Sequence, residues 1–266
     1  MYFYKNNERM DILPYCLISI TAFLASLSTF FSGFGLGTIL LPVFSLFFSL
    51  EIALATTALV HFINGFFKVT LTFKNINWPI FLKFGSFAFF GSMFGAYLIY
   101  ALGDMGLVYS TSFGGSTNEV NYTEFSLGVV MLIFASLEFT SFLENRKIGK
   151  LWIPFGGFIS GFFGGFSGHQ GAVRSAFLSN ASLTKFEFIA TSALLAVIID
   201  LTRISSYAQQ LDSEIPIGLV ATGAVFAILG SLVGNKLLKK TEMRFIKGII
   251  GCFLFTVGTI MLLGLL

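Results

Sequence analysis

The sequence contains few charged residues. Only 11% of its 266 residues are Asp, Glu, Lys or Arg, and 55% are hydrophobic, whereas about a quarter of a typical soluble domain is charged. No polar stretch is long enough to form a separate soluble domain, and the net charge of +3 is too small and too local to indicate nucleic-acid binding. The composition predicts an all-α integral membrane protein in the cell membrane, with the lipid bilayer as its main partner and the bacterial inner membrane as its expected location.

Cysteine and histidine are also scarce. Cys16 and Cys252 both lie in apolar stretches, which argues against a disulfide framework or a metal site. The sequence has neither an H-E-x-x-H motif nor an ATP-binding motif. We therefore predict no metal, no cofactor and no catalytic residue.

One short motif offers an enzymatic alternative. Gly165-Phe-Ser167-Gly168 spells G-x-S-G, the nucleophile motif of rhomboid proteases. A serine nucleophile needs a base within hydrogen-bonding reach. His169 follows Ser167 by two residues and is expected to point in another direction on a helix, while His61 lies in the other half of the chain. An intramembrane serine protease is therefore the weakest reading.

The apolar stretches predict a polytopic bundle of eight to ten helical segments. Some of them, such as 151–166 and 168–181, are too short for comfortable full spans, and we expect this pair to form a hairpin that crosses only part of the bilayer. The same reservation applies to 33–48. The expected segments are 12–31, 33–48, 52–73, 79–101, 124–143, 151–166, 168–181, 186–205, 215–237 and 246–266.

Two short tracts of the sequence echo each other. Ser32-Gly33 and Ser167-Gly168 lie 135 residues apart, and so do Ala55-Thr-Thr-Ala-Leu59 and Ala190-Thr-Ser-Ala-Leu194. Duplicated apolar units with glycine-broken helices are typical of transporters. Within a single domain over 1–266 we therefore predict a first repeat at 12–101, a linking loop and helix at 102–150, a second repeat at 151–237 and a final helix at 238–266.

The loop charges predict that the second repeat is inverted. The loops at 144–150 and 236–247 are basic, whereas those at 103–123 and 209–214 carry acidic residues and no Lys or Arg. The basic loops are therefore expected to be cytoplasmic. An odd number of crossings then separates the two repeats, as alternating access to one site requires.

The glycine tracts are the first candidate binding elements. Glycine allows a helix to break, and the exposed N–H groups at a helix start favour an anion. Pro42 strengthens the first break, and close helix packing through small residues is the alternative explanation. Gly91, Gly95, Gly230 and Gly234 fit that packing role better. The tract residues predicted to bind substrate are Ser32, Gly33, Gly35, Gly37, Ser167, Gly168, His169, Gln170 and Gly171.

Polar residues within the apolar helices are the second candidate set. Thr57, His61, Asn64 and Lys68 share one helix face by their spacing, and ionisable groups within a membrane favour a functional role. A hydrogen bond to a neighbouring helix is the alternative for His61, and snorkelling of the side chain to the interface is the alternative for Lys68. Further substrate-binding candidates are Thr56, Thr191, Ser192, Arg174 and Arg203, although Asp200 is placed to pair with Arg203.

The tracts from Ser32 to Pro42, Ala55 to Ala58, and Ser160 to Ala193 resemble the TauE/SafE family of sulfite exporters, which shows a glycine-rich tract, a proline and an Ala-Thr-Ser segment twice. Leu36 and His169-Gln170 interrupt the two glycine runs, and Phe177 stands in place of the second proline. The resemblance implies export of sulfite or a related small anion.

We expect a small anion to bind between the two tracts, with His61 exchanging a proton that drives transport, since histidine commonly titrates near physiological pH. A passive anion channel is the alternative function. The sequence predicts no particular oligomeric state.

Overall fold

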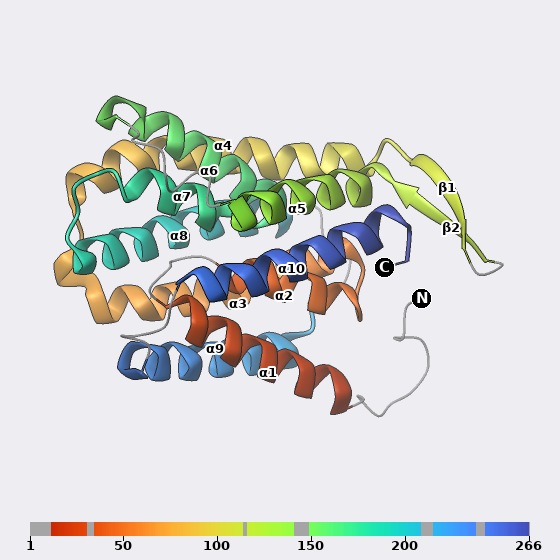
Figure 1. Ribbon diagram of the computed structural model, residues 1–266, viewed down its shortest axis with the longest axis horizontal. Coiled ribbons are helices and arrows are strands. Elements are labelled where there is room, and N and C mark those ends of the chain that lie inside the picture. The colour runs from red at the N-terminus through yellow and green to blue at the C-terminus, as the bar shows by residue number, and fades with distance from the viewer. Residues whose placement is uncertain are drawn as a thin grey trace.

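The computed structural model describes residues 12–30, 35–113, 116–140, 149–208, 215–237 and 243–265. Helices account for most of these residues, and a short two-stranded sheet joins α4 to α5 (Figure 1). The helices are α1 (Ile12–Thr29), α2 (Leu36–Ser45), α3 (Leu50–Thr72), α4 (Trp78–Gly103), α5 (Tyr122–Thr140), α6 (Ile153–Ser167), α7 (Gln170–Leu178), α8 (Lys185–Ala208), α9 (Ile217–Leu237) and α10 (Met243–Leu262). Two 3₁₀ turns, η1 (Phe73–Asn75) and η2 (Lys150–Trp152), precede α4 and α6.

The prediction of a polytopic all-α membrane protein is confirmed. Among the described helices, α1, α3, α4, α5, α8 and α9 are long and apolar enough to cross a membrane. Large apolar side chains such as Phe90 and Phe226 are exposed on their outer faces, as expected for contact with lipid. The main buried core joins α1, α2 and α3 to α5 and α10.

Local sequence sets the ends of several helices. Asn121 and Glu124 form a capping box at α5, since the Glu124 N–H donates to Asn121 Oδ1 at 2.8 Å and the Asn121 N–H donates to Glu124 Oε2 at 3.1 Å. Thr184 and Glu187 repeat this arrangement at α8. Such caps satisfy backbone N–H groups that a helix start leaves without partners.

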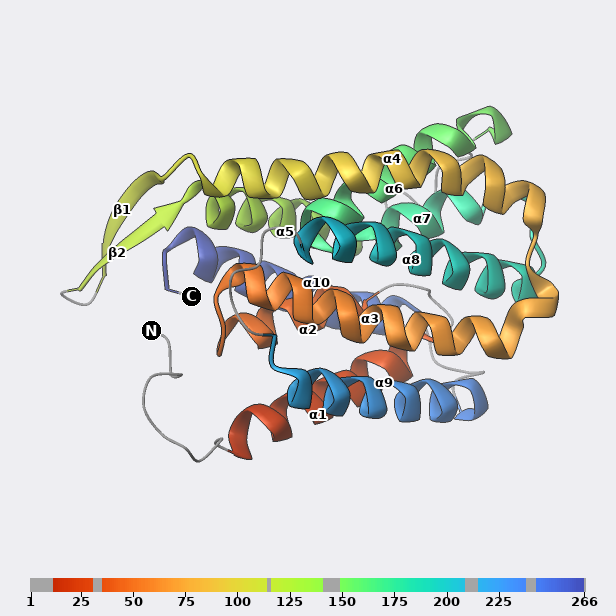
Figure 2. The ribbon, with the colours of Figure 1, turned by 180° about the vertical axis from the view of Figure 1, so that it is seen from behind.

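Each of the two short helices, α2 and α7, runs back toward the end of the bundle at which the preceding helix begins. In Figures 1 and 2, α1 begins at the end that carries the β-hairpin, and α2 runs back toward that end. Helix α6 begins at the opposite end, and α7 runs back toward it. The α1–α2 and α6–α7 pairs therefore enter the bundle from opposite ends, and the partial crossing expected for 151–181 stays a prediction.

Close glycine contacts hold two pairs of helices together. A Cβ atom on Gly91 or Gly95 of α4 would lie only 2.2 or 2.1 Å from the backbone oxygens of Phe158 and Phe162 in α6. These glycines allow the helix backbones to approach closely, in agreement with the packing role that the sequence suggested for them.

Helices α9 and α1 make the corresponding contact. A Cβ on Gly230 or Gly234 would lie 2.3 or 2.7 Å from the backbone oxygens of Phe23 and Leu27. Phe23 and Leu27 precede Phe158 and Phe162 by 135 residues, the offset of the two glycine tracts. The same local packing thus occurs twice in the bundle.

The segment expected as a loop at 103–123 contains an antiparallel hairpin of β1 (Leu107–Phe113) and β2 (Ser116–Asn121). Its sequence is rich in Val, Tyr and Thr, which favour strands. The hairpin also has support from the helical bundle, because the Tyr109 hydroxyl donates to Leu262 O and the Thr111 hydroxyl donates to Leu263 O at 2.7 Å. This long-range contact explains why a local reading of the sequence missed the strands.

The described charges differ between the two ends of the bundle. Lys74 in η1 and Lys185 at the start of α8 lie at the end opposite the hairpin, and the hairpin end carries Asp104 and Glu119 (Figure 1). By the positive-inside rule, the end with Lys74 and Lys185 is the expected cytoplasmic end.

Candidate functional site

The two glycine-rich breaks lie against each other near the middle of the bundle. Gly168 ends α6 with a φ of +79°, and its N–H donates to Gly164 O at 3.0 Å. Gly35 precedes α2 with a φ of +116°. These left-handed conformations suit glycine. A Cβ on Gly37 would lie 3.6 Å from both Gly168 O and the His61 ring, so the starts of α2 and α7 are neighbours.

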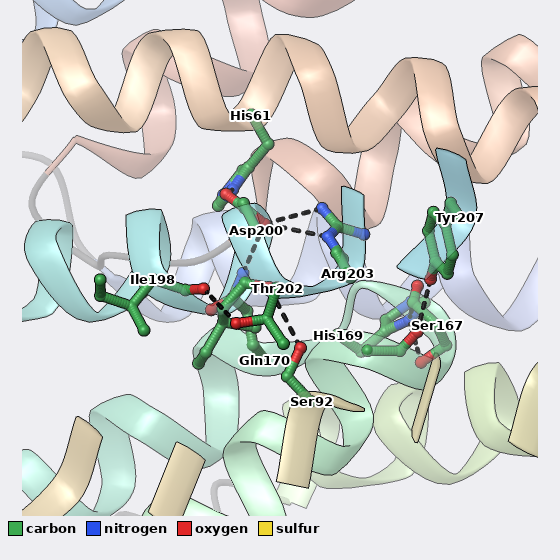
Figure 3. A network of polar contacts seen from close by, with 12 residues as sticks. His61, Ser92, Ser167, His169, Gln170, Ile198, Asp200, Thr202, Arg203 and Tyr207 are labelled. Atoms are coloured by element: carbon green, nitrogen blue, oxygen red, sulfur yellow. Dashed lines mark hydrogen bonds and ion pairs between the residues drawn. The ribbon is translucent and has the colours of Figure 1, made fainter. Parts of the chain in front are cut away.

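A buried carboxylate lies beside this junction. The side chain of Asp200 in α8 is fully buried, and its Oδ2 lies 2.5 Å from His61 Nδ1 in α3. Its Oδ1 accepts hydrogen bonds from Arg203 Nε at 3.0 Å and Gln170 Nε2 at 3.0 Å. Figure 3 shows these three side chains pointing toward Asp200 from α3, α8 and α7. A buried charge requires such partners, because leaving it unpaired is costly.

The network continues from Gln170 to a second cation. Gln170 Oε1 accepts a hydrogen bond from Arg174 Nη1 at 2.6 Å, and Arg174 Nε donates to Ser192 Oγ at 2.9 Å. Both the amide oxygen and the amide nitrogen of Gln170 are therefore hydrogen-bonded, and this side chain connects Asp200 to Arg174. Both arginines and Gln170 are almost completely buried.

A small cavity opens beside Arg174, between α3, α7 and α8. Five predicted site residues from three helices contribute to its wall, and both of its charged side chains, Lys68 and Arg174, are basic. Phe30 covers one side, with Lys68 Nζ 5.3 Å from its ring centroid. The cavity is lined by Phe30, His61, Asn64, Gly65, Lys68, Arg174, Ile189, Ser192, Ala193 and Ala196. A cavity with two cations in its wall suits a small anion.

The cavity lies toward the expected cytoplasmic end. Helix α3 runs from the hairpin end to η1, and Lys68 is in its last two turns. Helix α8 runs in the opposite direction, so Arg203 lies toward the hairpin end. The cations Lys68 and Arg203 are therefore on opposite sides of the His61–Asp200 contact.

Other candidate residues make structural contacts. Asn64 Oδ1 accepts a hydrogen bond from Ser231 Oγ at 2.8 Å, which joins α3 to α9. The Thr56 hydroxyl donates to Ile52 O in its own helix, and Thr191 Oγ1 accepts the Asn77 N–H. Neither threonine is part of the cavity wall.

Four further candidates from the sequence are not among the described residues that line the cavity. Gly171 is buried in the first turn of α7, and Thr57 is buried in α3 one turn before His61. Ser32 and Gly33 lie outside the described residues. Binding of substrate by any of these residues stays a prediction.

The expected separation of Ser167 from His169 is wrong. Because Gly168 breaks the helix, His169 Nδ1 lies 3.0 Å from Ser167 Oγ. However, Nδ1 also lies 2.9 Å from Ser167 O, which can only accept a hydrogen bond. That contact assigns the proton to Nδ1, so this atom is not available to take the serine proton. The Ser167 hydroxyl itself donates to Phe163 O at 3.1 Å.

Asp200 is the candidate site residue that the sequence did not single out. Its local pairing with Arg203 was expected and is confirmed, since Arg203 Nη2 lies 2.9 Å from Asp200 Oδ1. Its contact with His61 was not expected, although an aspartate within an apolar helix is itself a signal of function. Among the described residues, no group of three or more His, Cys, Asp or Glu side chains is arranged to hold a metal ion.

The fold and the site define a polytopic helical membrane protein with a cation-lined cavity beside two broken helix pairs. Comparison with protein families identifies it further: a family model described as "Sulfite exporter TauE/SafE" matches residues 18–261. The chain therefore belongs to the TauE/SafE family, a family of membrane transporters for sulfite-like anions. A comparison with curated proteins finds no match.

Proposed function

We propose that the protein exports sulfite or a related organosulfur anion across the cell membrane by alternating access. The observation that supports this most strongly is the cavity wall, in which Lys68 and Arg174 accompany the Ser192 hydroxyl and none of the described lining residues carries a carboxylate. An anion bound there gains charge-assisted hydrogen bonds from groups already in position. Membership of the TauE/SafE family supports the substrate class.

The proposed alternation uses two inverted repeats, 12–101 and 151–237. The opposite entry of the α1–α2 and α6–α7 pairs (Figures 1 and 2) supports this division. The recurrence of the α4–α6 glycine contact between α9 and α1 supports it as well. Repeats of opposite orientation can exchange their conformations, and the exchange opens one site to each side of the membrane in turn.

We propose that protons drive the transport through His61. The His61 side chain lines the cavity and also contacts Asp200 of α8. The cations of the cavity wall are Lys68, which is also in α3, and Arg174 of α7. Arg203 holds the other oxygen of Asp200. A protonated His61 would add positive charge beside the anion and strengthen the contact with Asp200, which couples anion binding to the α3–α8 interface.

The cavity assignment is tested by sulfite binding to purified protein in detergent. We expect Lys68→Gln to weaken sulfite binding by about tenfold, because it removes one charged partner of the anion. The matched control is Lys74→Gln, which removes an exposed lysine two turns further along the chain, outside the cavity.

Isothermal titration with sulfite gives the dissociation constant for each protein. A Lys68→Gln protein that binds sulfite as tightly as Lys74→Gln would contradict the proposed site. Wild-type protein that binds no sulfite, sulfate, thiosulfate or small sulfonate would contradict the proposed substrate class.

A further inference from the structure

Several buried polar atoms have no hydrogen-bond partner in the described structure, and two of those outside any ion pair belong to α3 and α8 on the hairpin side of the His61–Asp200 contact. They are the Thr57 hydroxyl oxygen and Arg203 Nη1, and both side chains are about 99% buried. Buried polar groups are nearly always paired, so such exceptions require an explanation. One explanation is that the two atoms belong to a ligand site and form hydrogen bonds when the ligand is bound.

The packing of α3 on α8 brings these two residues to the same level. His61 contacts Asp200, and a Cβ on Gly65 would lie 3.3 Å from the Val197 side chain. A step of four residues forward in α3, from His61 to Gly65, therefore corresponds to a step of three residues back in α8, from Asp200 to Val197. One turn before His61 in α3 is Thr57, and one turn after Asp200 in α8 is Arg203. The same register therefore sets Thr57 opposite Arg203.

Backbone groups complete the surroundings of Arg203. A Cβ on Gly168 would lie 2.9 Å from Arg203 Nη1, so the guanidinium lies over the glycine that breaks α6. Gly37, in the first turn of α2, is adjacent to Gly168 O. The N–H groups of this turn lack partners within the helix and favour an anion. Tyr207 lies on the other side of Arg203 and donates its hydroxyl to Gly165 O (Figure 3).

These groups correspond to those of the cavity through the 135-residue offset. Thr57 corresponds to Ser192, and Arg203 corresponds to Lys68. In the cavity, the Ser192 hydroxyl and Lys68 line one wall. On the hairpin side, the corresponding hydroxyl and cation are present, and Arg203 is almost completely buried, whereas Lys68 is only partly buried.

We propose that Thr57, Arg203 and the first turn of α2 form a second half-site for the same small oxyanion, which opens toward the hairpin end when the Lys68 cavity closes. This inference rests on the proposed function and deepens it. The described conformation is the one open at the Lys68 side. The anion passes from Lys68 and Ser192 to Arg203 and Thr57 as the two repeats exchange conformations, and there it satisfies the two unpartnered atoms.

The test is the variant Thr57→Val, which removes the hydroxyl and keeps the shape of the side chain. The matched control is Thr202→Val, because Thr202 is also buried, its hydroxyl is already bonded to Ile198 O, and it is not among the substrate-binding candidates. We expect Thr57→Val to bind sulfite in detergent as wild type does, because the Lys68 cavity is intact. In proteoliposomes we expect its sulfite exchange to be slower by about tenfold, the effect of losing one hydrogen bond to a charged ligand.

The thermal stability of the purified variants distinguishes this result from misfolding. Thr57→Val is expected to unfold at or above the wild-type temperature, because it removes a buried hydroxyl without a partner. If Thr57→Val exchanges sulfite as fast as Thr202→Val, the second half-site is overturned. If wild-type protein exchanges no sulfite, the proposed function fails, and the inference that rests on it fails with it.

Discussion

At the scale of single residues, helical spacing predicted a large part of the cavity. His61, Asn64 and Lys68 share one face of α3 because of the 3.6-residue period, and all three line the cavity. The contact between His61 and Asp200 could not be predicted in this way. It depends on the antiparallel register of two helices whose contacting residues are 139 positions apart in the chain.

The two histidines of the chain provide a direct test of the proposed proton coupling. His61→Gln removes the ring that lines the cavity, and its amide can still donate to Asp200. We expect this variant to transport sulfite at the same rate with and without a pH gradient, whereas wild-type transport is faster with the gradient. The measurement is sulfite flux in proteoliposomes with and without an imposed pH difference.

The control for that measurement is His169→Gln. His169 is buried, stacks on Phe134 and does not line the cavity, so this variant should keep the stimulation by the gradient. Protonation of sulfite itself affects all three proteins equally. Stimulation of His61→Gln to the wild-type extent would contradict the coupling role.

At the scale of the helices, the sequence predicted the order and nature of the segments better than their ends. The expected helix at 168–181 begins at Gln170 in the structure, because Gly168 adopts a left-handed conformation that ends α6. The helix expected at 33–48 is described from Leu36 to Ser45. Such boundaries depend on local caps and breaks, which hydrophobicity alone does not specify.

The glycine contacts predict a paired effect on stability. Gly91→Ala and Gly230→Ala each place a methyl group against backbone of the facing helix, so each should reduce the free energy of unfolding by about 1–3 kcal/mol. The two effects should be similar, because the two contacts are alike. Thermal or denaturant unfolding of the purified variants in detergent measures them.

Gly248→Ala is the matched control. Gly248 lies in α10, and a Cβ there would meet no atom within 4 Å, so the free energy of unfolding should not fall and should rise by up to about 1 kcal/mol, because alanine favours the helix. Equal stability of all three variants would contradict the close-packing role of Gly91 and Gly230.

At the scale of the whole molecule, the duplicated tracts were the most informative part of the sequence. They predicted two glycine breaks, and the structure brings Gly37 of one tract next to Gly168 of the other. The sequence also indicated that the two tracts differ in chemistry. His169, Gln170 and Arg174 of the second tract have no polar counterparts at 34, 35 and 39. Among the described residues of the two tracts, the side chain that joins the Asp200 network comes from the second.

This asymmetry agrees with a transporter whose two half-sites have different roles. The cavity side combines Lys68 with Arg174, whereas Arg203 on the hairpin side is held by Asp200. An anion should therefore bind more tightly on the Lys68 side, where two cations line one cavity. Tighter binding at the expected cytoplasmic end suits an exporter that collects its substrate from the cell.

Alternating access to an anion site can be measured as counterflow in proteoliposomes. Vesicles loaded with unlabelled sulfite are diluted into a trace of radiolabelled sulfite, and the label inside is followed with time. Alternating access predicts that the label inside accumulates transiently above its equilibrium level and that the rate of uptake saturates with sulfite concentration. Label that only equilibrates, at a rate proportional to concentration, would contradict alternating access and identify a passive anion channel.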